Sequence, residues 1–218
     1  MFKGKKKSPD IHSDKISRLF IRLGLAFVIF SILIFTLVFA PVITAEIGYA
    51  FFSSKNPAVV SRSAIILDYN NIIIPLDETF GIVIPKINAN ARIIKDVDAF
   101  DSSIYQKMLM KGVAHAKGSA YPSDNGNVFI FAHSSDNWYR ANRYNSVFYL
   151  LHKLEKNDEI YIFYENRKYK YLVTKKSIVE PQNDKYMKAD FIGSNLTLMT
   201  CWPPGTTLKR LLIFAVKV

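Results

Sequence analysis

A long uncharged segment near the N-terminus constrains this chain most strongly. From Leu23 to Ala45 the sequence has 23 consecutive residues without a charged side chain. A helix rises 1.5 Å per residue, so about 20 apolar residues cross the hydrocarbon core of a bilayer. Residues 1–22 carry seven Lys or Arg against two Asp. Because basic flanks stay in the cytoplasm, we expect a single-pass signal anchor at 23–45, a cytoplasmic tail at 1–22 and the remainder outside the cell.

A cleaved signal peptide is the alternative to an anchor. The apolar part of a signal peptide is usually about 7–15 residues long, which is shorter than the segment seen here. The residues Ile43, Thr44 and Ala45 could nevertheless form a small-residue cleavage site. The length favours an uncleaved anchor that has the lipid bilayer as its partner, and in both cases residues 46–218 are exported.

The formal net charge of +11 raises the question of an anionic partner. Residues 1–22 contribute +5 of this net charge, and the positive charge of this tail indicates membrane orientation. The remaining basic residues alternate with acidic ones, as in 153–170. No helix-turn-helix, zinc-finger or phosphate-loop signature accompanies them. We therefore expect no nucleic-acid partner.

The exported part divides into residues 46–79 and residues 80–218. The first region contains a polar linker at 53–57 and a predicted strand at 64–67, and is expected to be a juxtamembrane stalk. Beyond it, short apolar or alternating segments are separated by turn residues, a pattern typical of β-strands. These segments are 81–84, 128–131, 159–164, 169–178, 196–200 and 211–216.

Helix signals are few. One helix is expected from Asp101 or Ser102 to Lys111, with Ile104, Met108 and Leu109 on one side. A second is expected at 146–154, with its four aliphatic residues inward: Val147, Leu150, Leu151 and Leu154. Many short strands with one or two short helices predict a mainly β fold that forms a closed or nearly closed barrel.

The single cysteine, Cys201, excludes an intrachain disulfide and any site that needs several cysteines. A buried cysteine is often only a small hydrophobic residue. Cys201, however, follows the predicted strand 196–200 and precedes Trp202 and a Pro-Pro-Gly turn. A thiol held at the end of a strand and facing a loop is well placed to act as a nucleophile.

Two further residues could support such a nucleophile. His133 follows the apolar segment 128–132, so it also lies at a strand end and could serve as the base. Arg210 begins the predicted strand 211–216, and antiparallel pairing across the turn would return it beside Cys201. A fixed guanidinium there could stabilise an oxyanion. A loop histidine and a solvated arginine are the plain alternatives.

These motifs together resemble those of a known family. The segment 197–201, Thr-Leu-Met-Thr-Cys, and its continuation to Arg210 resemble the signature of the sortases, membrane-anchored cysteine transpeptidases of the bacterial surface. Residues 126–133 resemble the strand that carries the family's histidine, and 84–87 and 111–115 resemble two further family segments. The resemblance spans about residues 80–218 and implies a closed eight-stranded catalytic β-barrel.

The resemblance also implies roles and partners. Cys201 would be the nucleophile, His133 the general acid and base, and Arg210 the group that stabilises the substrate or the tetrahedral intermediate. Substrates would be secreted proteins with a C-terminal sorting signal similar to Leu-Pro-X-Thr-Gly, cleaved through a Cys thioester. The acceptor would be an amine of a cell-wall precursor or of another surface protein. We expect substrate contacts from Thr200 and Trp202, and neither a cofactor nor a metal.

Some alternatives stay open. Ala132 stands where the family commonly has Gly, and Ser134 stands where an Arg often follows the histidine. His115 is a second candidate base, but we expect it to be structural, and we expect His152 to be exposed. The chain could also be a sortase-like peptidase with water as the acceptor, or a catalytically inert membrane-tethered barrel that binds peptides.

Overall fold

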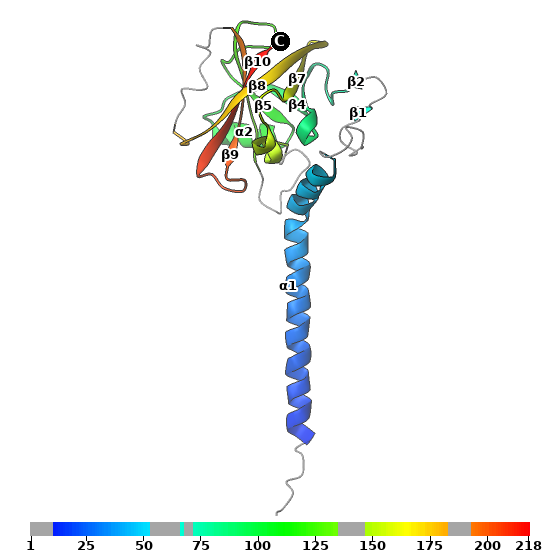
Figure 1. Ribbon diagram of the computed structural model, residues 1–218. Coiled ribbons are helices and arrows are strands. Elements are labelled where there is room, and N and C mark those ends of the chain that lie inside the picture. Colours follow the sequence, from blue (N-terminus) through cyan, green and yellow to red (C-terminus); the bar gives the residue numbers. More distant parts are fainter. Residues whose placement is uncertain (1–10, 53–65, 68–71, 135–146, 183–192) are drawn as a thin grey trace, which may run out of the picture. The chain divides into compact units, whose positions relative to one another are not determined.

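The computed structural model describes residues 11–52, 66–67, 72–134, 147–182 and 193–218. The chain forms two compact units, Met1–Thr44 and Ala45–Val218. Figure 1 shows one long helix and a small β-barrel.

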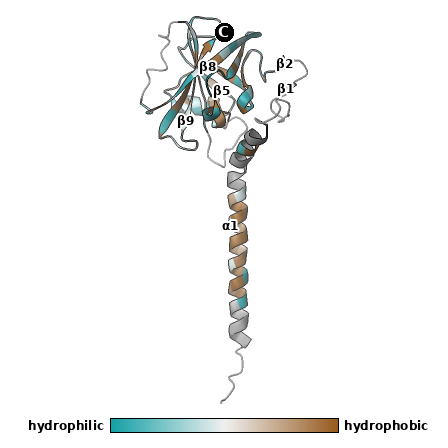
Figure 2. Cartoon of the chain, viewed as in Figure 1, coloured by the Kyte–Doolittle hydropathy of each residue, from teal (hydrophilic) through white to brown (hydrophobic). Residues whose placement is uncertain are grey.

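Helix α1 runs from Ile11 to Phe52 and contains the whole predicted span 23–45. Within it, Arg18–Thr36 is long and apolar enough to cross a membrane. Large apolar side chains such as Phe27 are exposed there, and most of this stretch has the brown of hydrophobic residues in Figure 2. The helix continues through residues 46–52, which the sequence analysis assigned to the stalk.

A small two-stranded sheet lies between the helix and the barrel in sequence. Strands β1 (Ile66–Leu67) and β2 (Ile72–Ile73) pair antiparallel. The strand predicted at 64–67 is therefore found at 66–67, while residues 64–65 and the linker at 53–57 lie outside the described residues. Ile73 packs against a minor apolar cluster formed by Val83, Tyr161 and Phe163.

Eight strands close into a barrel in the order β10-β8-β7-β3-β4-β5-β6-β9, which confirms the predicted fold (Figure 1). The pairs β4–β5 and β6–β9 are parallel and the others are antiparallel. The strands are β3 (Phe80–Ile84), β4 (Ala89–Val97), β5 (Val113–Ala116), β6 (Gly126–Phe131), β7 (Glu159–Tyr164), β8 (Arg167–Val179), β9 (Ser194–Trp202) and β10 (Lys209–Lys217).

The six strands expected from residue 80 onward are all present, but β4 and β5 were not predicted from the sequence. In β4 the buried positions include Ala89 and Ala91, and alanine is depleted in strands, so the alternation is weak. Strand β5 has only four residues, all of them buried, so it shows no alternation. Both strands become recognisable only through their pairing with neighbouring strands, antiparallel with β3 and β6 and parallel with each other.

Alternate residues of the strands fill the barrel. Ile82, Ile130 and Leu198 are fully buried examples. The predicted helix at 146–154 is found as a 3-10 helix, η3 (Tyr149–Lys153), and Leu151 and Leu154 are buried in the core as expected. Val147 and Leu150 pack against the same core.

Helix α2 (Ser102–Leu109) begins as expected at Asp101, whose carboxylate accepts the backbone N–H of Ser103 at 2.9 Å and of Ile104 at 3.2 Å. Leu109 is buried and Met108 packs on the core. Ile104, predicted on the same side as Met108 and Leu109, is exposed, and Tyr105 packs on the core with these two residues. Tyr105, Met108 and Leu109 have the three- and four-residue spacing of one helix face.

The barrel has two ends, which we call the Cys201 end and the Phe80 end. Strands β3, β6, β8 and β9 run toward the Cys201 end, and the other four run away from it toward the Phe80 end. The candidate site residues of the sequence analysis are at the Cys201 end, whereas His115 is associated with the Phe80 end.

Candidate active site

Cys201 and Arg210 lie opposite each other on neighbouring strands. Strands β9 and β10 pair antiparallel with Cys201 and Arg210 as direct register partners, which confirms the predicted pairing. Both side chains are half-buried, and the thiol of Cys201 is free. The pairing places a cationic side chain beside the only thiol of the chain.

His133 lies just beyond the end of the adjacent strand, β6. The parallel pairing of β6 with β9 ends at Phe131 and Met199. Ala132 extends it, since its N–H donates to Met199 O at 3.1 Å and its carbonyl accepts the Thr200 hydroxyl at 3.0 Å. His133 and Cys201 each follow this last pair by two residues, so they come at the same level of neighbouring strands.

Cys201 and Arg210 also share a face of the sheet. Register partners in a sheet project to the same side, and successive residues of a strand alternate. Ile130, Leu198 and Ile213 point into the core. Cys201 and Arg210 have the opposite parity, so they lie on the outer face. The fold therefore places a thiol and a guanidinium side by side, with His133 just beyond the end of the adjacent strand at the same end of the barrel.

The guanidinium of Arg210 is held by the loop between β9 and β10. Its Nη1 donates to the carbonyl oxygens of Thr207 and Lys209, both at 3.1 Å. Both acceptors are neutral carbonyl oxygens, so these bonds orient the guanidinium without neutralising its charge.

Thr200 and Trp202 flank Cys201 on the other face of β9. The Thr200 hydroxyl is buried and bonded to Ala132 O, so it ties the end of β9 to the end of β6. Trp202 is half-buried against the core and is joined to Pro203 by a cis peptide bond. Substrate contact by either residue stays a prediction.

His152, expected to be exposed, is half-buried. Its Nδ1 lies 3.1 Å from Tyr149 O, and its ring centroid lies 5.4 Å from that of Trp202. Burial lowers the pKa of His152. No local sequence pattern predicts this contact, because the two rings come from η3 and β9, which are far apart in the chain.

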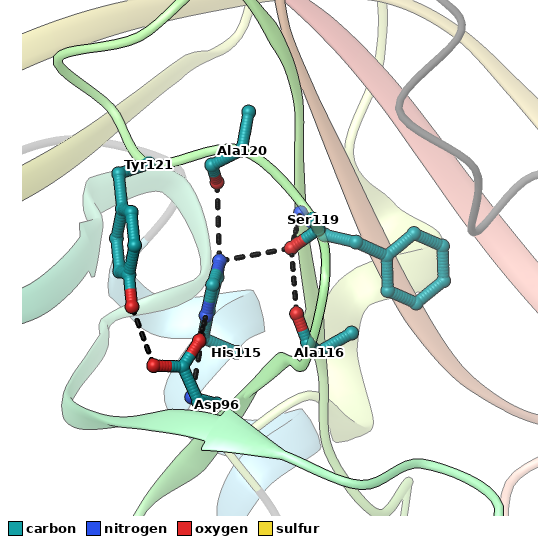
Figure 3. A network of polar contacts seen from close by, with 7 residues as sticks. Asp96, His115, Ala116, Ser119, Ala120 and Tyr121 are labelled. Carbon is teal, nitrogen blue, oxygen red and sulfur yellow. Dashed lines mark hydrogen bonds and ion pairs between the residues drawn. The ribbon is translucent and has the colours of Figure 1, made fainter.

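His115, the second candidate base, is fully buried in β5 (Figure 3). Its Nε2 lies 3.1 Å from Ala120 O and 2.8 Å from Ser119 Oγ. A carbonyl can only accept, so Nε2 carries the proton, and Nδ1 accepts the backbone N–H of Asp96 at 3.4 Å. Burial lowers the pKa of His115, which favours this neutral form.

Asp96, His115 and Ser119 are the residue types of a catalytic triad, but their bonding is structural (Figure 3). Ser119 Oγ donates to Ala116 O at 2.8 Å and accepts the N–H of Phe129 at 3.2 Å. Because Nε2 already holds a proton, it cannot take one from Ser119. The sequence expectation of a structural His115 fits these bonds, although the side chain lies in the interior and not at a rim.

Tyr121 contacts both His115 and Asp96 of this network. Its ring stacks on His115 at 4.8 Å, and its hydroxyl donates to Asp96 Oδ2 at 2.5 Å. This hydrogen bond raises the pKa of Tyr121 to about 12, so the phenol remains a donor. Among the residues that the structure describes, no group of three or more His, Cys, Asp or Glu could hold a metal ion.

Residues 82–218 match the family model of the sortase domain. Sortase D of Bacillus subtilis (strain 168) is 30% identical over 138 residues, which are 62% of this chain and 61% of that protein. The chain thus spans less than two thirds of the length of this curated relative.

Solved structures with the same fold include three sortases. The lid mutant of sortase A from Corynebacterium diphtheriae is 30% identical with a TM-score of 0.53, covering 65% of this chain and 70% of that one. Sortase C-1 from Actinomyces oris is 26% identical with a TM-score of 0.54, covering 66% and 76%. Clostridium perfringens sortase C, solved with the C-terminal cell wall sorting motif, is 26% identical with a TM-score of 0.53, covering 63% and 69%.

Proposed function

The chain belongs to the sortase family, and on that premise we propose that it is a cysteine transpeptidase that joins exported proteins to surface amines. One observation supports this most directly. A cysteine and an arginine are register partners near the ends of neighbouring strands, and a histidine follows the end of the next strand at the same end of the barrel. This arrangement supplies a nucleophile, a proton carrier and an oxyanion-stabilising cation in one place.

The first step is acyl transfer to the enzyme. The Cys201 thiolate attacks the scissile carbonyl carbon, and the carbonyl electron pair moves to oxygen to form a tetrahedral intermediate. His133, as imidazolium, protonates the leaving amine when the C–N bond breaks. The products are a thioester on Cys201 and a released peptide with a new amino terminus.

In the second step, His133 accepts a proton instead of donating one. Neutral His133 takes a proton from the incoming amine as its nitrogen attacks the thioester carbon. The second tetrahedral intermediate then collapses, expels the Cys201 thiolate and leaves an amide bond. If water attacks instead, the product is a carboxylic acid and the enzyme acts as a peptidase.

Arg210 has to change partners during these steps. Its Nη1 is bonded to two loop carbonyls, Thr207 O and Lys209 O. A substrate oxygen that gains negative charge is a stronger acceptor than a neutral carbonyl. We therefore assign Arg210 the role of exchanging at least one of these bonds for the developing oxyanion.

The substrate class is proposed from the family. The matching Clostridium perfringens sortase C was solved with a C-terminal cell wall sorting motif. By similarity, this chain would cleave a signal related to Leu-Pro-X-Thr-Gly in secreted proteins, with an amine of a cell-wall precursor or another surface protein as acceptor. Thr200 and Trp202 would help to shape the substrate site.

The proposed layout places the enzyme on the outer side of the membrane. Residues 1–22 would form the cytoplasmic tail, 23–45 the anchor, 46–79 the juxtamembrane region and 80–218 the catalytic barrel. The apolar stretch Arg18–Thr36 of α1 supports the anchor, and the start of β3 at Phe80 supports the barrel boundary. The positive charge of residues 1–22 supports the orientation.

Mass spectrometry of the intact protein tests this function. The full chain in detergent is incubated with a Leu-Pro-X-Thr-Gly peptide library and an amine, and a mass increase equal to the acyl fragment is sought on Cys201. We expect this adduct in the wild type and in the exposed control Lys156→Ala. Cys201→Ala should give none. An inert barrel would give no adduct with any peptide, and a peptidase would give only hydrolysed product.

A further inference from the structure

Two aromatic rings from distant parts of the chain meet at the Cys201 end. The rings of His152 in η3 and Trp202 in β9 lie 5.4 Å apart between centroids and are tilted by 50°. Trp202 directly follows Cys201. The proposed acyl-transfer steps give this histidine no role, yet it contacts the neighbour of the nucleophile.

Hydrogen bonds to Tyr149 and Lys176 hold His152 in place. Because Tyr149 O can only accept, the Nδ1 of His152 carries the proton, and this bond of 3.1 Å fixes the ring against its own helix. The ammonium of Lys176 donates to His152 O at 3.0 Å and to Leu154 O at 3.2 Å, which ties η3 to β8. Leu151 is fully buried in the core. The ring of His152 is therefore a fixed support and not a freely moving side chain.

Trp202 is the point at which β9 becomes a loop. Its pairing with Lys209 is the last of the β9–β10 ladder, and residues 203–208 connect the two strands. The loop is held at its other end by Arg210, which donates to Thr207 O. A shift of Trp202 would thus move the loop and, through the backbone, Cys201.

The loop lies on one side of the nucleophile, and the strands lie on the other. On the strand side, Phe131 is buried in the core cluster and Met199 packs against it, so the protein itself fills this side. The amine has to approach the thioester from the side that the acyl chain leaves open. That side is the strand end, where residues 203–208 lie.

We propose that His152 is a positioning residue that holds Trp202, and through it the 203–208 loop, in the geometry that admits the acceptor amine to the thioester. The inference rests on the proposed transpeptidase function and adds a determinant of its second step. It concerns the competition between the amine and water for the same acyl-enzyme.

The partition of the thioester between these two nucleophiles tests the proposal. The full chain in detergent is given a sorting-signal peptide and glycinamide, and the ratio of amide to acid product is measured beside the rate of thioester formation. Loss of one aromatic contact in His152→Ala should lower the ratio about fivefold. His152→Phe, which keeps a ring against Trp202, should restore it to within about twofold of wild type.

Leu150→Ala is the matched control for general loosening of η3. Leu150 lies in the same 3-10 helix and packs on the core. We expect this variant to lower the melting temperature while the product ratio stays as in wild type. An equal fall of the ratio in Leu150→Ala would overturn a specific role of His152.

Fluorescence provides a readout that does not depend on turnover. With Trp138→Phe, Trp202 is the sole tryptophan. A protonated imidazole in contact quenches indole, so emission should fall on acidification, with a midpoint below the ordinary pKa of 6.5 because burial lowers the pKa of His152. His152→Phe should remove this step. A step that persists in His152→Phe would overturn the contact.

The two proposals fail in distinguishable ways. No thioester in the wild type would overturn the transpeptidase function and this inference with it. A thioester in the wild type with an unchanged ratio in folded His152→Ala would overturn this inference alone. An equal loss of thioester formation and aminolysis would also overturn it, since His152 would then support the whole barrel end.

Discussion

The two ends of the barrel use similar side chains in opposite ways. At the Phe80 end, His115 is fully buried, and both ring nitrogens and the hydroxyl of Ser119 are engaged in hydrogen bonds (Figure 3). At the Cys201 end, Cys201, His133 and Arg210 are half-buried and lie at or just beyond strand ends. The cluster of His115, Ser119 and Asp96 therefore stabilises the fold, whereas the proposed catalytic residues lie at strand ends beside loops.

Burial explains the contrast. A buried polar group that loses its partner costs about 1–3 kcal/mol, so such groups are bonded to the protein itself. A saturated group has nothing left to offer a substrate without breaking those bonds. Half-buried groups at strand ends are fixed by the sheet and still accessible. The comparison predicts that substitutions at the Cys201 end lower activity and that substitutions at the Phe80 end lower stability.

The largest effect is expected for the nucleophile. Cys201→Ala should lower transpeptidation at least about a thousandfold, because no other group can form the thioester. Its melting temperature should stay within about 2 °C of wild type, since the thiol is half-buried and small. Ser119→Ala is the matched variant at the Phe80 end, and we expect it to lower the melting temperature and keep the rate. Product assays and thermal unfolding decide both, and a large loss of rate in Ser119→Ala would break the comparison.

Arg210→Lys should lower kcat/KM about a hundredfold, which is the usual loss when an oxyanion donor is misplaced. Lysine keeps the charge, but it lacks the planar fork that bonds two loop carbonyls and an oxyanion in turn. Steady-state kinetics measure the effect. Lys209→Arg, at an exposed position next to it, is the control and should have little effect. Full activity of Arg210→Lys would show that only charge matters.

His115→Leu should destabilise the fold by about 2–3 kcal/mol, because the N–H of Asp96 and the Ala120 carbonyl lose a buried partner. Denaturant unfolding measures this loss. Thioester formation by the folded fraction should remain, as the network belongs to the other end of the barrel. Loss of activity without loss of stability would make His115 a functional residue.

The same histidine gives a pH signature. Burial lowers the pKa of His115 below its ordinary value of 6.5, so the unfolded chain takes up this proton before the folded chain does. The stability that neutral His115 contributes is present above pH 6.5 and is lost as the pH falls through the lowered pKa. Unfolding curves at a series of pH values should show this loss in wild type and less of it in His115→Leu. Parallel curves for the two proteins would contradict the expectation.

The smallest effect is expected where a polar contact supports the proposed site from inside. Thr200→Val keeps the shape of the side chain and removes the bond to Ala132 O, so the free energy of unfolding should fall by about 1 kcal/mol. Because this bond ties the strand of the nucleophile to the strand of the histidine, a modest fall in kcat should accompany it. Thr174→Val removes an equivalent bond to Phe214 O elsewhere and should leave kcat unchanged.

The sequence alone determined the features that depend on neighbours in the chain. An uncharged stretch predicts the anchor, short apolar or alternating segments between turn residues predict six of the barrel strands, and an acid at a helix start predicts the cap at Asp101. The motifs around His133, Cys201 and Arg210 also indicate the family. Each of these signals is read within a few residues.

Only the tertiary structure decided what depends on packing between distant segments. Strands β4 and β5 were recognised only from their pairing with other strands, and Tyr105, not Ile104, packs on the core with Met108 and Leu109. The burial of His115 and the contact of His152 with Trp202 join residues from separate elements. Periodicity shows which face of an element is apolar, but the residues that pack against that face depend on how all the strands close into the barrel.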